Sequence, residues 1–164
     1  MELMIGIAIV GILASIATPN YIKFREKARV ELAITEMRFI EKEIMNYLVD
    51  NGELPEDLSA IGMDDILDPW GRPYNYLRIS ESDESEEDEA QDNKGNKGKK
   101  GKKDDKGKKG KPRKDHSLHP INTDYDLFSV GKDGKSTAAL TAKISQDDIV
   151  RANNGRYLGL VSKY

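Results

Sequence analysis

The chain has 164 residues, enough for one compact domain with appendages, and a formal net charge of −3. It contains no cysteine, which excludes a disulfide framework, a thiolate metal site and a cysteine nucleophile. Charged residues make up 34% of the chain, and they are grouped in blocks. The small net charge therefore hides strongly charged segments.

The chain begins with an apolar run, MELMIGIAIVGILASIATPNY. The 15 uncharged residues 3–17 would rise about 23 Å as a helix, against roughly 30 Å of bilayer hydrocarbon. No basic stretch precedes the run and no A-x-A cleavage site follows it, which argues against a secretory signal. We interpret the run as a membrane anchor whose first residues are missing from this sequence. Glu2 at its edge is costly unless paired, which points to a function.

The helix is predicted to continue beyond the apolar run, because no Gly or Pro occurs between Pro19 and Gly52. Apolar side chains recur at helical spacing and form one stripe, made of Ala33, Met37, Ile40, Ile44, Tyr47 and Leu48. Residues 3–49 thus predict one helix of about 70 Å. Pro19 removes a backbone hydrogen bond and should kink or loosen it.

Residues 51–80 are expected to form a loop and a first strand, with DPWGRP as a turn and YNYLRI as the strand. Residues 81–93 then carry eight acidic and no basic side chains, and residues 94–115 carry twelve basic and three acidic ones. A stretch without large apolar residues cannot offset the entropy of ordering. We therefore predict a disordered charged insert over 81–119.

The fold is expected to resume over 120–164. TDYDLFSVG predicts a strand, KDGKSTAALTAKISQDDI a loop, VRANNG a short turn or helix, and RYLGLVSKY a final strand. VGKDGKS is a turn containing an acid, and ISQDDI supplies two adjacent acids. These residues suit either a hard cation such as Ca²⁺ or an ordinary turn followed by a helix N-cap.

The N-terminal segment resembles that of type IV pilins and type II secretion pseudopilins, in which a glutamate, a long apolar run and a proline recur. Glu2 and Pro19 match that glutamate and proline at the family's spacing. DPWGRPYNY and YDLFSVGKDGK…SQDDI resemble the major pseudopilin of type II secretion. The insert and the loop between Asp133 and Asp147 are longer than the family pattern.

The resemblance implies an α+β, pilin-like fold, in which a long N-terminal helix packs against a small antiparallel sheet with a calcium-binding loop. It implies that Glu2 pairs with the N-terminal amine of a neighbouring subunit during assembly. It also implies a calcium site, with the ligands Val130, Asp133, Lys135, Ser145 and Asp147. Asp148 is a weaker candidate. The domain organisation is then the N-terminal helix over 1–50, the loop and first strand of the globular domain over 51–80, the disordered insert over 81–119, and the remaining strands with the calcium loop over 120–164.

The function implied by the resemblance is that of a structural subunit of a periplasmic pseudopilus, assembled from the inner membrane, that drives protein export. The implied partners are further copies of the chain, minor pseudopilins, the assembly platform, the membrane and a prepilin peptidase, with methylation of the N-terminus. The alternative is a type IV pilin of an extracellular pilus. A third hypothesis is a monomeric, membrane-tethered protein whose charged arm binds anionic surfaces.

Other motifs carry little chemistry. The lone Trp70 is expected to anchor its turn on the core. His116 and His119 are the only histidines, and no G-x-S-x-G or phosphate-binding loop occurs, so no catalytic residues are predicted. The basic tract lacks interleaved aromatic residues, so we expect no nucleic-acid binding by base stacking.

Overall fold

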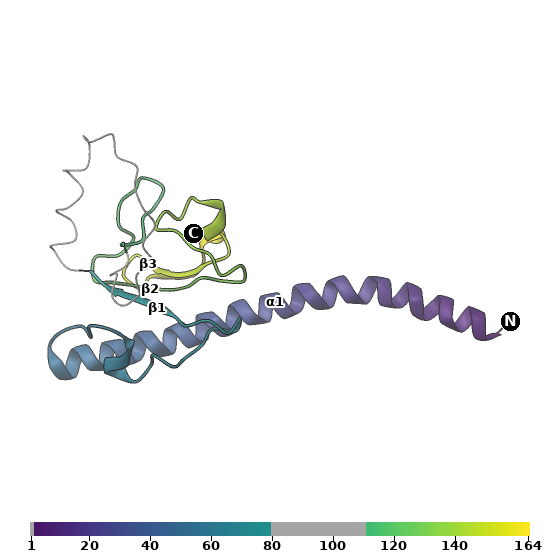
Figure 1. Cartoon of the computed structure of the whole chain (residues 1–164), viewed down its shortest axis with the longest axis horizontal. Coiled ribbons are helices and arrows are strands. Elements are labelled where there is room, and N and C mark those ends of the chain that lie inside the picture. The colour runs from purple at the N-terminus through teal and green to yellow at the C-terminus, as the bar shows by residue number, and fades with distance from the viewer. Residues whose placement is uncertain (1, 80–110) are drawn as a thin grey trace, which may run out of the picture.

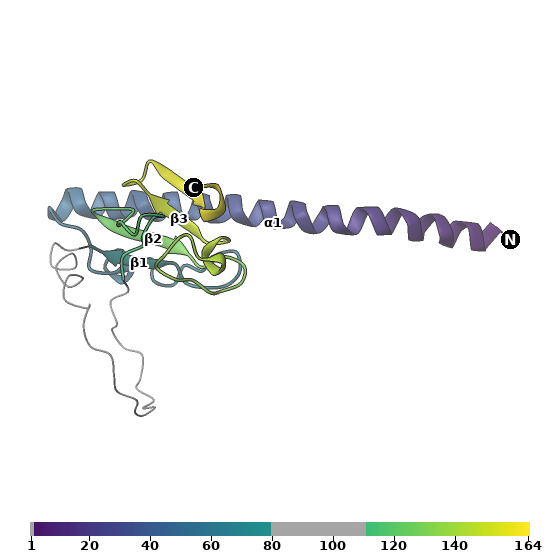
Figure 2. The same ribbon diagram turned by 90° about the horizontal axis from the view of Figure 1, so that it is seen from above.

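The computed structural model describes residues 2–79 and 111–164. Its dominant feature is a single helix, α1 (Glu2–Asn51), of 50 residues, which at 1.5 Å per residue is about 75 Å long. Figures 1 and 2 show the C-terminal part of α1 lying under a small domain, while the N-terminal part projects far beyond it. The single predicted helix is therefore confirmed.

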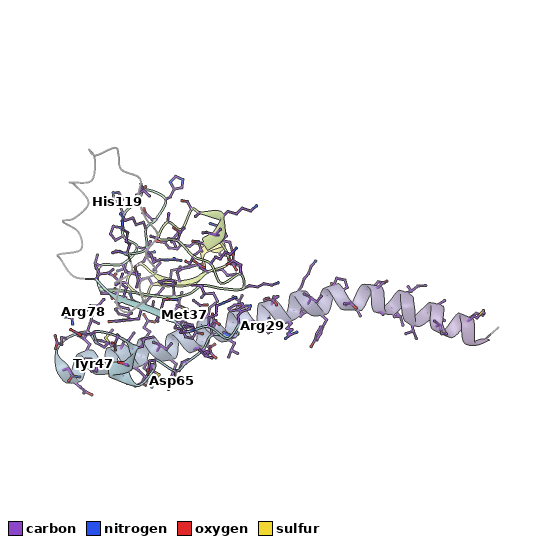
Figure 3. All side chains as sticks on the ribbon, viewed as in Figure 1. Arg29, Met37, Tyr47, Asp65, Arg78 and His119 are labelled. Carbon is purple, nitrogen blue, oxygen red and sulfur yellow. The ribbon has the colours of Figure 1, made fainter. Side chains whose placement is uncertain are left out.

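The helix packs on the domain through the predicted apolar stripe. Ala33, Met37, Ile40 and Ile44 are at most 1% exposed. Their spacings of four, three and four residues place them on one face of an α-helix. Figure 3 shows Met37 between α1 and the sheet. The hydrophobic effect of burying this stripe fixes which side of α1 faces the domain.

Four short strands form one antiparallel sheet in the order β1-β2-β3-β4. The strands are β1 (Asn75–Arg78), β2 (Tyr125–Ser129), β3 (Ile149–Ala152) and β4 (Tyr157–Leu160). Within residues 2–79 and 111–164, three 3-10 turns accompany them, η1 (Leu58–Ile61), η3 (Lys143–Ser145) and η4 (Val161–Lys163). The α+β class is as expected, and the strands expected in YNYLRI, TDYDLFSVG and RYLGLVSKY are all present.

Both faces of the sheet are covered. The first face meets α1 through Tyr125, Leu127 and Ile149, and Trp70 packs against this cluster as expected. The second face is covered by a smaller cluster made of Ile121, Leu140, Val150, Ala152 and Val161. Alternation along β2 and β3 explains the division, because successive side chains point to opposite faces of a strand.

Two expectations are wrong. VRANNG is not a turn or helix: its first three residues belong to β3, and the turn begins only at Asn153. The predicted disordered insert also extends too far, because Lys114 forms bridges to Pro120 and Ala139. Residues 111–119 are therefore part of the domain. The rest of the predicted insert, 81–110, and the Glu2 side chain lie outside what the structure describes.

Candidate stalk and cation loop

The N-terminal half of α1 is an apolar stalk without intramolecular contacts to cover it. Every described side chain from residue 4 to residue 25 is exposed. The exposed fractions of Met4, Ile7 and Val10, for example, are 80%, 66% and 66%. Among the described residues this is the one helix apolar and long enough to cross a bilayer, with a most apolar window of mean hydropathy 1.8 and none of it buried. Length and composition thus fit a membrane anchor.

Pro19 lies inside the stalk, and α1 continues through it. Proline has no N–H to donate to the carbonyl of Ser15, so one helical hydrogen bond is missing there. The Thr18 hydroxyl donates to the carbonyl of Ala14 at 2.8 Å. Figure 1 shows a gentle bend in the N-terminal half of α1 without a break, so Pro19 loosens the helix locally rather than ending it.

The two aspartates predicted to bind calcium meet across the turn at residues 130–135 (the cation loop), which contains Asp133 and contacts Asp147. The Asp133 N–H donates to Asp147 Oδ2 at 2.9 Å, and the Lys135 N–H donates to Asp133 Oδ1 at 2.8 Å. In the part of the chain described, neither carboxylate has a Lys or Arg within ion-pair distance. Among the described residues, neither of these two acids is therefore neutralised by an ion pair.

Glycine is required where this turn approaches Asp147. Gly131 has φ +62°, a left-handed conformation, and a Cβ on it would overlap the backbone carbonyl of Asp147. Gly134 has φ +70°, and a Cβ there would lie 2.6 Å from the guanidinium of Arg72. The Arg72 guanidinium also donates to the carbonyls of Gly131 and Lys132. The turn is therefore held between Arg72 and Asp147.

The other predicted ligands differ in how near they lie to the two aspartates. Val130 directly precedes Gly131, the residue that closely approaches Asp147. Ser145 is fully buried, its hydroxyl is bonded to Thr137, and its carbonyl accepts from the Asp148 N–H at 3.2 Å. Asp148 is bonded to Arg113 and Ser136 instead of facing the turn.

The residues present fit a hard divalent cation. Ca²⁺ prefers carboxylate and carbonyl oxygens, and Asp133, Asp147 and the carbonyl-rich turn supply such oxygens. Two carboxylates that form no ion pair within the described residues are also groups that a cation would stabilise. No three His, Cys, Asp or Glu side chains gather in the described residues, so backbone oxygens would have to complete the site.

Arg113 falls within the insert predicted from the sequence, but in the structure it is only 3% exposed. Its guanidinium forms an ion pair with Asp148, donates to the Thr137 carbonyl at 2.7 Å and lies 4.2 Å from the centre of the Phe128 ring. Its backbone N–H donates to Asp126 Oδ2 at 2.6 Å. Burial raises the pKa of Asp148, against the lowering effects of the Ser136 hydroxyl and of Arg113. Arg113 therefore anchors the end of the charged segment in the domain.

One sequence signal could have revealed this anchor. Residues 94–111 contain lysine as their only basic residue, and Arg113 is the only arginine between Arg78 and Arg151. Arginine is preferred over lysine for buried ion pairs because its planar guanidinium is weakly hydrated and makes several directed hydrogen bonds. The change from lysine to arginine, directly after Pro112, marks where the chain rejoins the fold.

A second buried arginine ties the sheet to the helix. Arg151 on β3 is 3% exposed, and its Nε donates to Glu41 of α1 at 2.9 Å. Its other nitrogens donate to Asp124 at 2.7 and 2.8 Å, and its guanidinium lies 3.9 Å from the centre of the Tyr125 ring. Hydrogen bonds to Asp124 and Glu41 raise the pKa of Arg151, although burial alone lowers it. Helix and sheet are thus joined by charge as well as by apolar contact.

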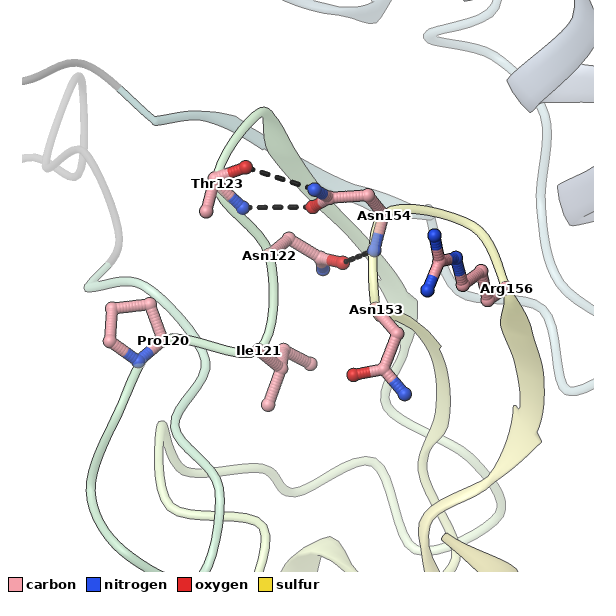
Figure 4. Close-up of a pocket in the computed structure, with 7 residues that line it drawn as sticks. All are labelled: Pro120, Ile121, Asn122, Thr123, Asn153, Asn154 and Arg156. Atoms are coloured by element: carbon pink, nitrogen blue, oxygen red, sulfur yellow. Dashed lines mark hydrogen bonds between the residues drawn. The ribbon is translucent and has the colours of Figure 1, made fainter.

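A polar pocket lies at the other end of β3 from the cation loop (Figure 4). Its lining residues are Pro120, Ile121, Asn122, Thr123, Asn153, Asn154 and Arg156. Asn154 is bonded to Thr123 through both side-chain atoms at 2.9 Å, and its N–H donates to Asn122. The lining has no acid or histidine, and the Thr123 hydroxyl is bonded to Asn154 without a neighbouring base. His119 lies on the side of the domain away from α1 (Figure 3) and is exposed, as is His116.

Comparison with known proteins gives relatives of two kinds. The type II secretion system core protein G of Aeromonas hydrophila is 29% identical over 100 residues, covering 47% of this chain and 68% of the relative. The same protein of Vibrio cholerae is 32% identical over 97 residues, covering 47% and 66%. A type IV major pilin protein of Neisseria gonorrhoeae is 38% identical over 63 residues, covering 38% of each chain.

No family model and no solved structure matches the chain. The relatives nevertheless agree with the architecture: one long apolar helix followed by a small antiparallel sheet. On the alignments to core protein G, the chain belongs to the major pseudopilins of the type IV pilin-like superfamily.

Proposed function

We propose that the chain is a structural, non-catalytic subunit of a periplasmic pseudopilus that assembles from the inner membrane and drives protein export by type II secretion. The observation that carries the proposal is the uncovered stalk of α1. An apolar surface of this size is unstable in water and must be covered by lipid or by other subunits. In a filament, the stalks of neighbouring copies would cover one another, as apolar helices pack in bundles.

The same helix supports the anchoring of the free subunit as a single-pass protein of the inner membrane. Directly after the apolar run come Tyr21, Phe24 and three exposed cations, Lys23, Arg25 and Lys27. Aromatic and basic residues are typical of the interface between hydrocarbon and lipid head groups. The span would thus end near residue 22. The periplasmic side of the domain belongs to the proposed pseudopilus function and does not follow from these cations.

The role proposed for Glu2 can be tested in cells. Replacement of Glu2 by Ala should leave the subunit in the membrane but abolish filaments, because the N-terminal amine of the neighbouring copy would lose its partner carboxylate near hydrocarbon. Filaments are counted by electron microscopy, and the membrane fraction is measured by immunoblot. The exposed Glu56→Ala variant is the control and should assemble normally. Normal filaments of Glu2→Ala would refute the pairing.

We further propose that Ca²⁺ stabilises the loop through Asp133, Asp147 and the carbonyls of Val130, Lys135 and Ser145. A cation that binds only the folded chain raises its stability, by about 2.7 kcal/mol at a hundredfold excess over Kd. Chelator should therefore lower the melting temperature of the full chain in detergent micelles. Asp133→Ala and Asp147→Ala should melt alike with and without chelator. Asp65→Ala, an exposed acid, should respond as the wild type does.

A chelator without effect on the wild type would remove calcium from the proposal and leave the filament function standing. The pilin relatives favour one alternative, a type IV pilin of an extracellular pilus. A strain lacking its own major pseudopilin separates the two functions. Restored protein secretion supports the pseudopilus, whereas surface pili without secretion support the pilin.

A further inference from the structure

The turn at residues 68–73, DPWGRP, contacts the cation loop on one side and α1 on the other. Asp68 is 3% exposed and shapes this turn. Its Oδ1 accepts from the backbone N–H groups of Trp70 and Arg72 at 3.0 and 2.9 Å. Its Oδ2 accepts from the Ser129 hydroxyl at 2.6 Å. One buried carboxylate thus both folds the turn and fixes it to the end of β2.

The cation loop is bonded to Ser129, the partner of Asp68, and directly to Arg72 of the turn. The Ser129 hydroxyl oxygen accepts from the Gly131 N–H at 3.1 Å. The guanidinium of Arg72 donates to the carbonyls of Gly131 and Lys132 and lies against Gly134. Asp147 contacts the same loop from the other side through Gly131. Any shift of the loop relative to Asp147 must therefore move or break the contacts of Arg72.

The other side of the turn touches α1 where the stalk leaves the domain. Trp70 Nε1 donates to Glu26 Oε2 at 3.3 Å, and Lys132 Nζ of the cation loop lies 4.0 Å from the same oxygen. Glu26 Oε1 accepts from Arg29 at 3.1 Å. Residues 4–25 are exposed, and Glu26 is the first half-buried position among the described residues of α1. Glu26 thus marks the boundary between stalk and domain.

We infer that the 68–73 turn couples the cation loop to the base of the stalk. Within this turn, Arg72 is the positioning residue that contacts the cation loop, and Trp70 contacts Glu26 of α1. The inference rests on the proposed calcium binding. Cation binding at Asp133 and Asp147 would restrict the motion of the cation loop and so of Arg72, which is bonded to its carbonyls. Arg72 lies in the same turn as Trp70, and Trp70 and Lys132 both contact Glu26 of α1. Calcium bound to the cation loop therefore makes the part of α1 near Glu26 more rigid. A constant angle between the stalk and the domain is needed for subunits to stack in a filament.

The experiment measures amide hydrogen exchange at residues 22–30 of the full chain in detergent micelles, with Ca²⁺ and with chelator. Calcium should slow exchange there by about tenfold in the wild type, within the range typical of coupled sites. It should also shift the fluorescence of Trp70, the only tryptophan. Arg72→Gln is measured at a calcium concentration that calorimetry shows to be saturating for this variant, and there it should lose most of both responses. Arg78→Gln, another half-buried arginine, is the matched control and should keep both.

The outcomes separate this inference from the calcium proposal. Calcium binding by the wild type without slower exchange at 22–30 overturns the coupling and leaves the calcium site intact. If the wild type binds no calcium, the coupling between the cation loop and α1 is tested in the metal-free chain. There, Arg72→Gln should speed exchange at 22–30 by about threefold relative to Arg78→Gln, and equal rates would overturn the coupling.

Discussion

Replacing Arg113 by Met should destabilise the domain by about 3–5 kcal/mol, the cost of leaving one member of a buried ion pair alone. Asp148, the partner, is fully buried, so it would remain as a charge without a cation or water. Burial already raises the pKa of Asp148 in the presence of Arg113, and this shift should grow in the variant. The bond to the Thr137 carbonyl and the contact with Phe128 would be lost as well.

Thermal melting of the full chain in detergent micelles measures the effect, expected as a fall of roughly 10 °C or more. Arg156→Met is the control, because Arg156 is exposed, and should melt close to the wild type. The double variant Arg113→Met with Asp148→Leu should regain part of the loss, since it removes both charges. Single effects that simply add in the double variant would contradict a coupled pair.

The anchor also decides where the charged segment can be cut. The Ile79 N–H donates to the carbonyl of Asp124, just before β2, and the Arg113 N–H donates to the side chain of Asp126 within β2. The two ends of the segment therefore lie near one another. A short glycine linker in place of 81–110 should therefore preserve stability and filament assembly. Deletion of 81–115 should instead behave like Arg113→Met. Loss of assembly in the shorter deletion would favour the charged-arm hypothesis.

Replacing Gly131 by Ala should cost about 2–5 kcal/mol. Left-handed backbone costs an L-residue about 1–2 kcal/mol, and forcing extra atoms into a packed site costs about 1–3 kcal/mol more. The added Cβ would overlap the Asp147 carbonyl, so either the 131–135 turn or the start of β3 must move. Calcium affinity should fall in parallel, because the same movement separates Asp133 from Asp147.

Gly71→Ala separates the two causes. Gly71 also has a left-handed backbone, with φ +83°, but a Cβ there would meet nothing within 4 Å. Denaturant unfolding of both variants should thus give a clearly larger loss for Gly131→Ala, with unchanged calcium affinity for Gly71→Ala. Equal losses would show that backbone conformation alone matters and that the close approach to Asp147 does not.

The sequence alone determined the features that depend on local patterns. The stripe containing Met37 and Ile40 has the helical period, so its burial followed from amphipathicity. The first two strands are short β-branched or aromatic stretches next to turn residues, and they lie where expected. The spacing of Glu2 and Pro19 indicated the superfamily. DPWGRP and GKDGK indicated the pseudopilins, but not that the two segments touch.

Only the tertiary structure decided the features that depend on distant partners. VRANNG was predicted as a short turn or helix, yet its first three residues belong to β3. There the charge of Arg151 is matched by Asp124 and by Glu41, 110 residues away. Arg113 belongs by composition to the charged segment, but Asp148, 35 residues later, makes its burial possible. A buried charge is stable only beside its counter-charge. Its position therefore follows from the fold and not from the residues around it in the sequence.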